Sequence, residues 1–229
     1  MHFLSLKMRL CHYFFKLTIF FIFISKMAFS QAVPVKEEPL HKPVFSNEYL
    51  RLLDVWLKPG DTSLFHIHEI PSVFCYLSTG RYLAKVEGEP GWTIVNAAAG
   101  QSWYRSFEEG RLVHQVANPF DTALHVTDIE LLGVWKKKAL APLPFNQLFS
   151  ADRIYAYQLY KNHLPDTMIS GRGPIMLEMV SGEVIFRSGK KKKSLLLKSG
   201  QYKFIEAGTS FSFQPVHGSD LVMNLFEIR

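Results

Sequence analysis

The feature that most constrains the fold is a pair of histidines, His66 and His68, separated by one residue and flanked by Gly60 and Gly80. Residues two apart on an extended strand point to the same face, so both imidazoles are expected on one face of a β-strand. A third imidazole from a distant strand would complete a three-nitrogen metal site. His114 is the candidate for that ligand. The segment therefore predicts a metal-binding β-structure.

Short apolar segments, rich in β-branched and aromatic residues, recur along the chain and end at glycine, proline or asparagine. No stretch keeps a helical period over three turns, although a short helical turn fits around residues 146–149. Strand-like segments every eight to twelve residues predict an all-β sandwich or barrel. In the first half these segments are 49–57, 72–77, 81–86, 92–95 and 122–131.

The second half of the chain repeats the turn pattern of the first. Gly182, Gly200 and Gly208 correspond to Gly80, Gly100 and Gly110. Their spacings are 18 and 8 residues, compared with 20 and 10 in the first half. Self-similarity of this kind indicates duplication. We therefore expect two barrels, residues 31–133 and 147–229, joined by a linker over residues 134–146.

Residues 60–80 and 100–118 resemble the two sequence motifs of the cupin family. The second motif matches more loosely, because its spacings are longer here and its proline is absent. The residues at motif positions are Gly60, His66, His68, Gly80, Gly100, Gly110, His114 and Asn118. The resemblance implies an all-β, duplicated cupin of two jelly-roll (double-stranded β-helix) barrels. It also implies a divalent metal ion in the first barrel, held by His66, His68 and His114.

The chain departs from the family at the motif's glutamate. That position falls at Ser72 or Val73, and Glu69 is a poor substitute because it neighbours His68 and points to the other strand face. The implied site is three histidines and water, as in thiol dioxygenases and other cupins without the carboxylate. Three neutral imidazoles leave the ion its full charge and open positions for a substrate anion or dioxygen.

No metal site is expected in the second half. His66 and His68 precede Gly80, and His114 follows Gly110. The positions at the same distances from Gly182 and Gly208 are occupied by Met168, Ser170 and Ser212. None of these side chains is an imidazole. The second barrel is therefore predicted to be degenerate, and to serve as a structural or dimerising half in a homodimer.

Residues 1–30 have the composition of a secretory signal peptide. Four basic and no acidic residues surround a short apolar run, 17–24, before the small residues Ala28 and Ser30. The run is well below the roughly 20 residues of a membrane-spanning helix, so periplasmic or secreted localisation is expected and a membrane anchor is the alternative. Beyond this segment, 22 basic residues face 20 acidic ones. That near-neutral balance gives no support for binding nucleic acid.

Several other side chains invite a functional reading that the sequence does not favour. Cys75 is expected to be a core thiol, and Arg51 to face solvent rather than a substrate carboxylate. Phe65, Trp103 and Tyr104 are candidates for the wall of a pocket. The histidines outside the motifs, expected to be surface or structural residues, are His41, His125, His163 and His217.

Three classes of function fit this sequence. The first is a mononuclear metalloenzyme, an oxygenase, isomerase or hydrolase acting on a small organic molecule. The second is a non-catalytic cupin that binds a small molecule, and the third is a structural cupin whose histidines are relics. No catalytic acid or base is evident, and the ligands do not distinguish Fe, Mn, Ni, Cu and Zn.

Overall fold

The computed structural model describes residues 31–135, 141–165, 167–189, 193–218 and 220–229. Residues 33–229 form one compact unit. The predicted signal peptide, residues 1–30, lies outside the described residues, so export stays a prediction. In the described ranges no helix is long and apolar enough to cross a membrane.

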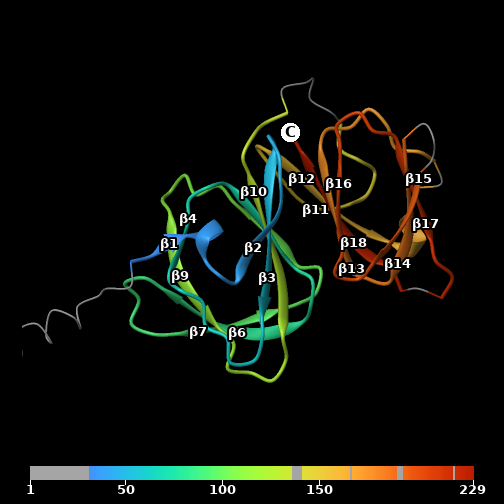
Figure 1. Ribbon diagram of the computed structural model, residues 1–229. Helices are drawn as coiled ribbons and strands as arrows, with labels where there is room; N and C mark the ends of the chain where they lie inside the picture. The colour runs from blue at the N-terminus through green and yellow to red at the C-terminus, as the bar shows by residue number, and fades with distance from the viewer. Residues whose placement is uncertain (1–30, 136–140, 166, 190–192, 219) are drawn as a thin grey trace, which may run out of the picture. The chain divides into compact units, whose positions relative to one another are not determined.

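Ten strands build two sheets in the N-terminal half (Figure 1). They are β1 (Val33–Pro34), β2 (His41–Ser46), β3 (Leu50–Leu57), β4 (His66–His68), β5 (Ser72–Tyr76), β6 (Gly80–Val86), β7 (Thr93–Ala97), β8 (Ser102–Arg105), β9 (Leu112–Ala117) and β10 (Leu124–Leu131). The sheet orders are β1-β4-β9-β6-β7 and β2-β3-β10-β5-β8. A 3-10 turn, η1 (Val35–Glu37), joins β1 to β2.

The C-terminal half contains eight more strands in two sheets. They are β11 (Asn146–Ala151), β12 (Ile154–Tyr160), β13 (Ile175–Ser181), β14 (Glu183–Ser188), β15 (Lys193–Lys198), β16 (Tyr202–Ile205), β17 (Phe211–Pro215) and β18 (Val222–Ile228), with a 3-10 turn η2 (Lys161–His163). The sheet orders are β11-β12-β18-β13-β16 and β15-β14-β17. The helical turn expected at residues 146–149 is wrong, because this segment pairs with β12 as an edge strand.

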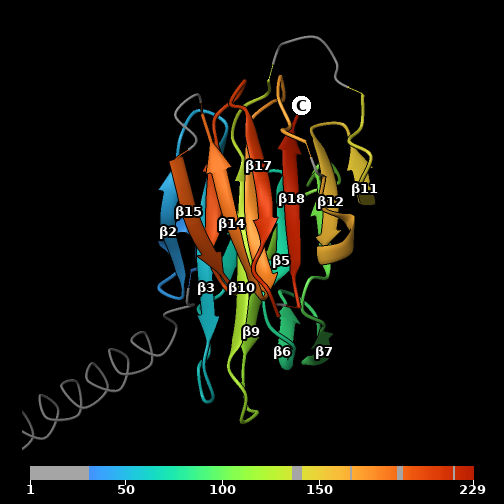
Figure 2. The ribbon, with the colours of Figure 1, turned by 90° about the vertical axis from the view of Figure 1, so that its right-hand side faces the viewer.

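The two halves share their strand order, which confirms the predicted all-β, duplicated cupin fold. The order β2-β3-β10-β5-β8 recurs as β11-β12-β18-β13-β16, strand for strand. Likewise β7-β6-β9 recurs as β15-β14-β17, and Figure 2 shows β14, β15 and β17 side by side. The three matched glycines of the second half all have a positive φ, a conformation that favours glycine, and so do Gly100 and Gly110 of the first half, whereas Gly80 begins β6.

The second barrel is degenerate because apolar side chains replace the histidines. In the first barrel His66 of β4 pairs with His114 of β9. In the second, the equivalent pair is an isolated bridge between Ile169 and Phe211. Both side chains belong to the apolar core of that barrel. The positions counted from the glycines, Met168, Ser170 and Ser212, are each one residue away from this pair.

An apolar core joins the two barrels. Its buried side chains come from β3, β5 and β10 of the first barrel and from β12, β13 and β18 of the second. Cys75 is one of them, fully buried, which confirms its predicted place as a core thiol. Because both barrels bury apolar surface against this one cluster, neither can expose it without a loss of stability.

A buried carboxyl group, Glu178 of β13, lies at the same junction. The Thr127 hydroxyl donates to its Oε2 at 2.9 Å, while Oε1 has no hydrogen-bond partner among the described residues. Burial raises the pKa of Glu178 to about 7, from an ordinary value of 4.5. The folded protein therefore keeps this group protonated at pH values where an unfolded chain has lost the proton.

This burial predicts a pH dependence of stability. Glu178 contributes its full stability below pH 4.5, and the contribution is lost as the pH rises towards 7, at up to about 1.4 kcal/mol per pH unit. Glu178→Gln keeps the shape and removes the titration. Urea unfolding between pH 4.5 and 7.5 should show a stability advantage of the variant that grows with pH. An exposed control, Glu87→Gln, should follow the wild type, and parallel curves for wild type and Glu178→Gln would contradict the assignment.

Candidate metal centre

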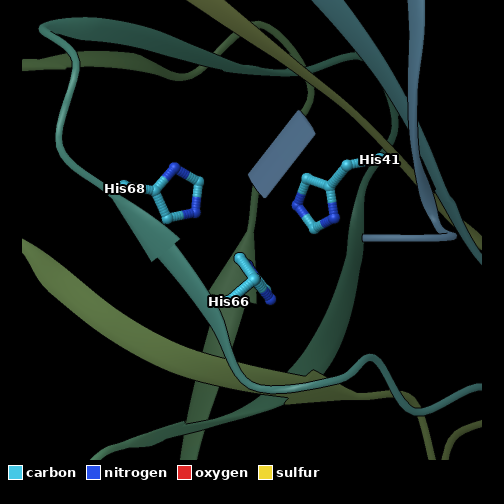
Figure 3. A group of neighbouring side chains, drawn as sticks. All are labelled: His41, His66 and His68. Carbon is cyan, nitrogen blue, oxygen red and sulfur yellow. The ribbon is translucent and has the colours of Figure 1, made fainter. Parts of the chain in front are cut away.

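The short strand β4 presents two imidazoles to the interior of the first barrel. His66 and His68 are both buried, and the intervening Ile67 has the opposite orientation, as strand alternation requires. Their ring centroids are 5.0 Å apart. Figure 3 shows the two rings projecting from β4 into the same space.

His114 meets this pair from the neighbouring strand β9. It lies directly opposite His66 in the antiparallel register, and the two ring centroids are 4.4 Å apart. Its Nε2 is 3.0 Å from the Nε2 of His68. Nitrogen ligands of a single metal ion lie at roughly this spacing. The structure thus brings together the three histidines singled out in the sequence.

A fourth histidine, His41 of β2, completes the group. Its ring centroid is 4.4 Å from that of His66, and the candidate ligand atoms of His41, His66 and His68 all lie within 4.8 Å of one another. Figure 3 shows the His41 ring facing the other two from a separate strand. The expectation of a surface position for His41 is therefore wrong, and the cluster makes it a candidate ligand beside the structural role that was expected. His41 lies outside both motifs, and only the pairing of β2 with β3 carries it to the cluster.

The hydrogen bonds of the cluster aim its ring nitrogens inward. Glu38 accepts from His41 Nδ1 at 2.7 Å, and the Leu64 carbonyl accepts from His66 Nδ1 at 2.9 Å. Each bond fixes the tautomer and leaves Nε2 with its lone pair free. His66 Nε2 is buried and has no hydrogen-bond partner among the described residues. A buried nitrogen without a partner is costly unless a ligand engages it, so these residues fit a metal ion.

Burial keeps the imidazoles of His66 and His114 neutral. It lowers the pKa of His66 to about 3, with the nearby His41 and His68 adding to the effect. Burial likewise lowers the pKa of His114 well below its ordinary value. A metal ion binds the neutral form of imidazole. An all-imidazole set suits Fe, Ni, Cu or Zn better than the oxygen-seeking Mg and Ca.

A small cavity of about 80 Å³ opens beside the histidines. Its walls are mostly apolar and aromatic, with one carboxyl group, Asp128, among them. Both oxygens of Asp128 are buried without a hydrogen-bond partner among the described residues, and Oδ2 lies 3.3 Å from His68 Nδ1. The lining residues are His41, Val55, Leu57, His68, Phe74, Tyr76, Tyr82, Trp103, His114, Val116, Leu124, Val126 and Asp128.

Some of the other residues singled out in the sequence lie where predicted and some do not. Trp103 lines the cavity, whereas Tyr104 points away to donate to Asp152 at 3.0 Å. Arg51 does not face solvent freely, because it pairs with the buried Glu130. The position of the family glutamate carries no replacement ligand, since Ser72 bonds to a backbone carbonyl and Val73 packs in the inter-barrel core. The place of Asp128 in the cavity could not be predicted from the sequence, because this residue lies in no recognisable motif.

By sequence the chain matches no family model and no curated protein. Solved structures match it by fold. Protein Ylba from E. coli is 13% identical over 81% of this chain and 81% of its own, with a TM-score of 0.58. A salicylate 1,2-dioxygenase from Pseudaminobacter salicylatoxidans is 10% identical over 82% of this chain and 76% of its own, with a TM-score of 0.56.

A third likeness names the fold directly. A cupin 2 conserved barrel domain protein from Leptotrichia buccalis is 10% identical over 84% of this chain and 89% of its own, with a TM-score of 0.53. Identities this low show the fold and carry nothing about substrates. The alignments nevertheless span both barrels, and the strand order repeats between them. The chain therefore has the duplicated β-barrel fold of the cupins.

Proposed function

We propose that this chain is a mononuclear metal-dependent cupin enzyme of the oxygenase class, acting on a small organic molecule. The observation that carries the proposal is the convergence of four imidazoles, His41, His66, His68 and His114, beside a small apolar cavity. A metal ion held there would supply Lewis acidity and, if it is redox-active, electron exchange with dioxygen. Export through residues 1–30 is part of the proposal, and an intact N-terminus on the mature protein would count against it.

The chain's own groups have separate tasks in this proposal. The apolar walls exclude water and admit a small substrate, since only a few polar atoms line the cavity. Asp128 Oδ2 lies 3.3 Å from His68 Nδ1, close enough to hold that ring by charge attraction once a metal ion is bound. The same carboxyl group can accept a proton from a substrate hydroxyl or thiol in the cavity. Phe74 and Trp103, whose rings stack at 5.1 Å, give the cavity one rigid aromatic wall.

The donor set favours oxygenase chemistry over the other two enzyme classes. Among the described residues the cluster consists of histidines, so an ion bound by them would keep its full charge. A water-poor cavity suits dioxygen, which is apolar, better than it suits hydrolysis. One of the solved structures of similar fold is a salicylate 1,2-dioxygenase, which supports the class without identifying a substrate.

The test combines metal analysis with an activity screen. Protein purified without chelators should contain about one equivalent of a transition metal by mass spectrometry. Oxygen consumption should then be measured against a panel of thiols, diketones and phenols, with a chelator-treated sample as the control. Failure to bind any of Fe, Mn, Ni, Cu or Zn would refute the metal site. One equivalent of metal without oxygen consumption on any substrate would favour the alternative, a non-catalytic cupin that binds a small molecule.

A further inference from the structure

A second cavity, of about 430 Å³, lies between the two barrels. The first barrel contributes Asp54, Trp56 and His125, and the second contributes β15 and the turn into β16. None of its lining residues lines the cavity beside the four histidines. The separation follows from strand alternation, because Val55 and Leu57 point into the first barrel while their neighbours Asp54 and Trp56 point out of it. Its volume is in the range of small-molecule sites, roughly 300–1,000 Å³.

The polar side of this cleft is a buried, ordered pair. Asp54 Oδ1 accepts from His125 Nε2 at 2.6 Å, and the imidazole is only 5% exposed. This bond places the proton on Nε2 and leaves the Nδ1 lone pair as an acceptor. The bond to His125 engages one carboxylate oxygen of Asp54, and the Asp54 side chain is 17% exposed. The second carboxylate oxygen of Asp54, Oδ2, is therefore available to a ligand that carries donors.

The turn from the second barrel lies directly against His125. Gly200 has a φ of 78°, a conformation that other residues rarely adopt. Even a Cβ atom at this position would come within 3.6 Å of His125 Nδ1 and Cε1. A side chain larger than that of alanine would therefore crowd the His125 ring. Gln201, which follows, lines the cleft and can offer its amide N–H groups.

The apolar side is a flat aromatic surface. The Trp56 indole stacks on the His125 ring, with centroids 4.0 Å apart and an interplanar angle of 16°. Trp56 is nevertheless 46% exposed, and Leu195 and Leu196 across the cleft are 45% and 43% exposed. Large apolar side chains this exposed, gathered around a polar pair, mark a binding surface.

We propose that this cleft binds a neutral pyranose sugar, a mono- or disaccharide, whose ring lies on the exposed face of Trp56 and whose hydroxyls donate to Asp54. A pyranose has an apolar face for the indole and a rim of hydroxyls that both donate and accept. A carboxylate or phosphate ligand is disfavoured because it would repel Asp54. The cleft thus gives the protein a second ligand site, independent of the metal centre.

Isothermal titration with glucose, galactose, mannose, N-acetylglucosamine, maltose and cellobiose tests this proposal on the full mature chain. At least one sugar should bind the wild type, and Trp56→Ala should weaken it at least about tenfold. Trp56→Phe should retain most of the affinity because a flat ring remains. The matched control is Trp92→Ala, which removes an equally exposed tryptophan, 41% exposed, from another surface.

The outcomes are decisive in both directions. Sugar binding that survives Trp92→Ala and His66→Ala, but not Trp56→Ala, would establish a site apart from the metal centre. Absence of binding by every sugar, or unchanged binding in Trp56→Ala, would overturn the proposal. Loss of binding in His66→Ala would place the sugar at the metal centre, and binding of tetramethylammonium in place of sugars would overturn the ligand class. None of these results depends on whether the metal centre turns over a substrate.

Discussion

Replacement of His66 by alanine is expected to abolish metal binding, with a loss of affinity of at least about 100-fold. In the proposed site His66 is the central candidate ligand, because its ring centroid is 4.4 Å from those of both His41 and His114. Even the loss of a group that only orients a ligand costs about 10–100-fold, so the loss of a central ligand should cost more. Metal content after dialysis, measured by mass spectrometry, reports the result.

His163→Ala is the matched control, since His163 lies in the exposed turn η2, away from the cluster. It should retain the full equivalent of metal. His41→Ala separates the two possible roles of the fourth histidine, because a ligand should be needed for binding and an orienting group should only weaken it. Urea unfolding of the chelator-treated variants should give free energies of unfolding similar to that of the chelator-treated wild type. Full metal occupancy in both His66→Ala and His68→Ala would end the metal-site interpretation.

Phe226→Ala is expected to cost about 3–5 kcal/mol of unfolding free energy, the largest stability effect in this protein. Phe226 of β18 is completely buried, and it lies opposite Ala156 and Met176 in the core that joins the barrels. Removal of its ring leaves a cavity that two sheets must close at once. Urea unfolding followed by tryptophan fluorescence measures the loss.

The same experiment tests whether the barrels unfold together. A core shared by both halves predicts a single transition in wild type and variant, moved to lower urea with little change in slope. Ile94→Ala, at a side chain 58% exposed on β7, should change stability by less than about 0.5 kcal/mol. Two separated transitions, or a cost below about 1 kcal/mol for Phe226→Ala, would show that each barrel is stable without the other.

Local patterns in the chain were enough for the fold class and for part of the site. The alternation of His66 and His68 predicts a shared strand face without knowledge of any partner, because side-chain direction along a strand has period two. Glycines at turn positions likewise predict the repeat, since a positive φ is a local requirement. The positions equivalent to the histidines could not be predicted in the second barrel. Counting from its glycines missed the Ile169–Phe211 pair by one residue, because a turn of different length changes the residue number of every position beyond it.

Groups that act through long-range contacts were decided only by the tertiary structure. His41 reaches the cluster because β2 pairs with β3, and Asp128 enters the cavity because β10 lies between β3 and β5. The pairing of Asp54 with His125 joins residues 71 apart in sequence, and the cleft beside it needs the second barrel as its other wall. The sequence alone determined which faces its strands would bury, because that choice depends on neighbours along the chain. Which of those faces would meet was determined by packing between distant strands, and no local period records it.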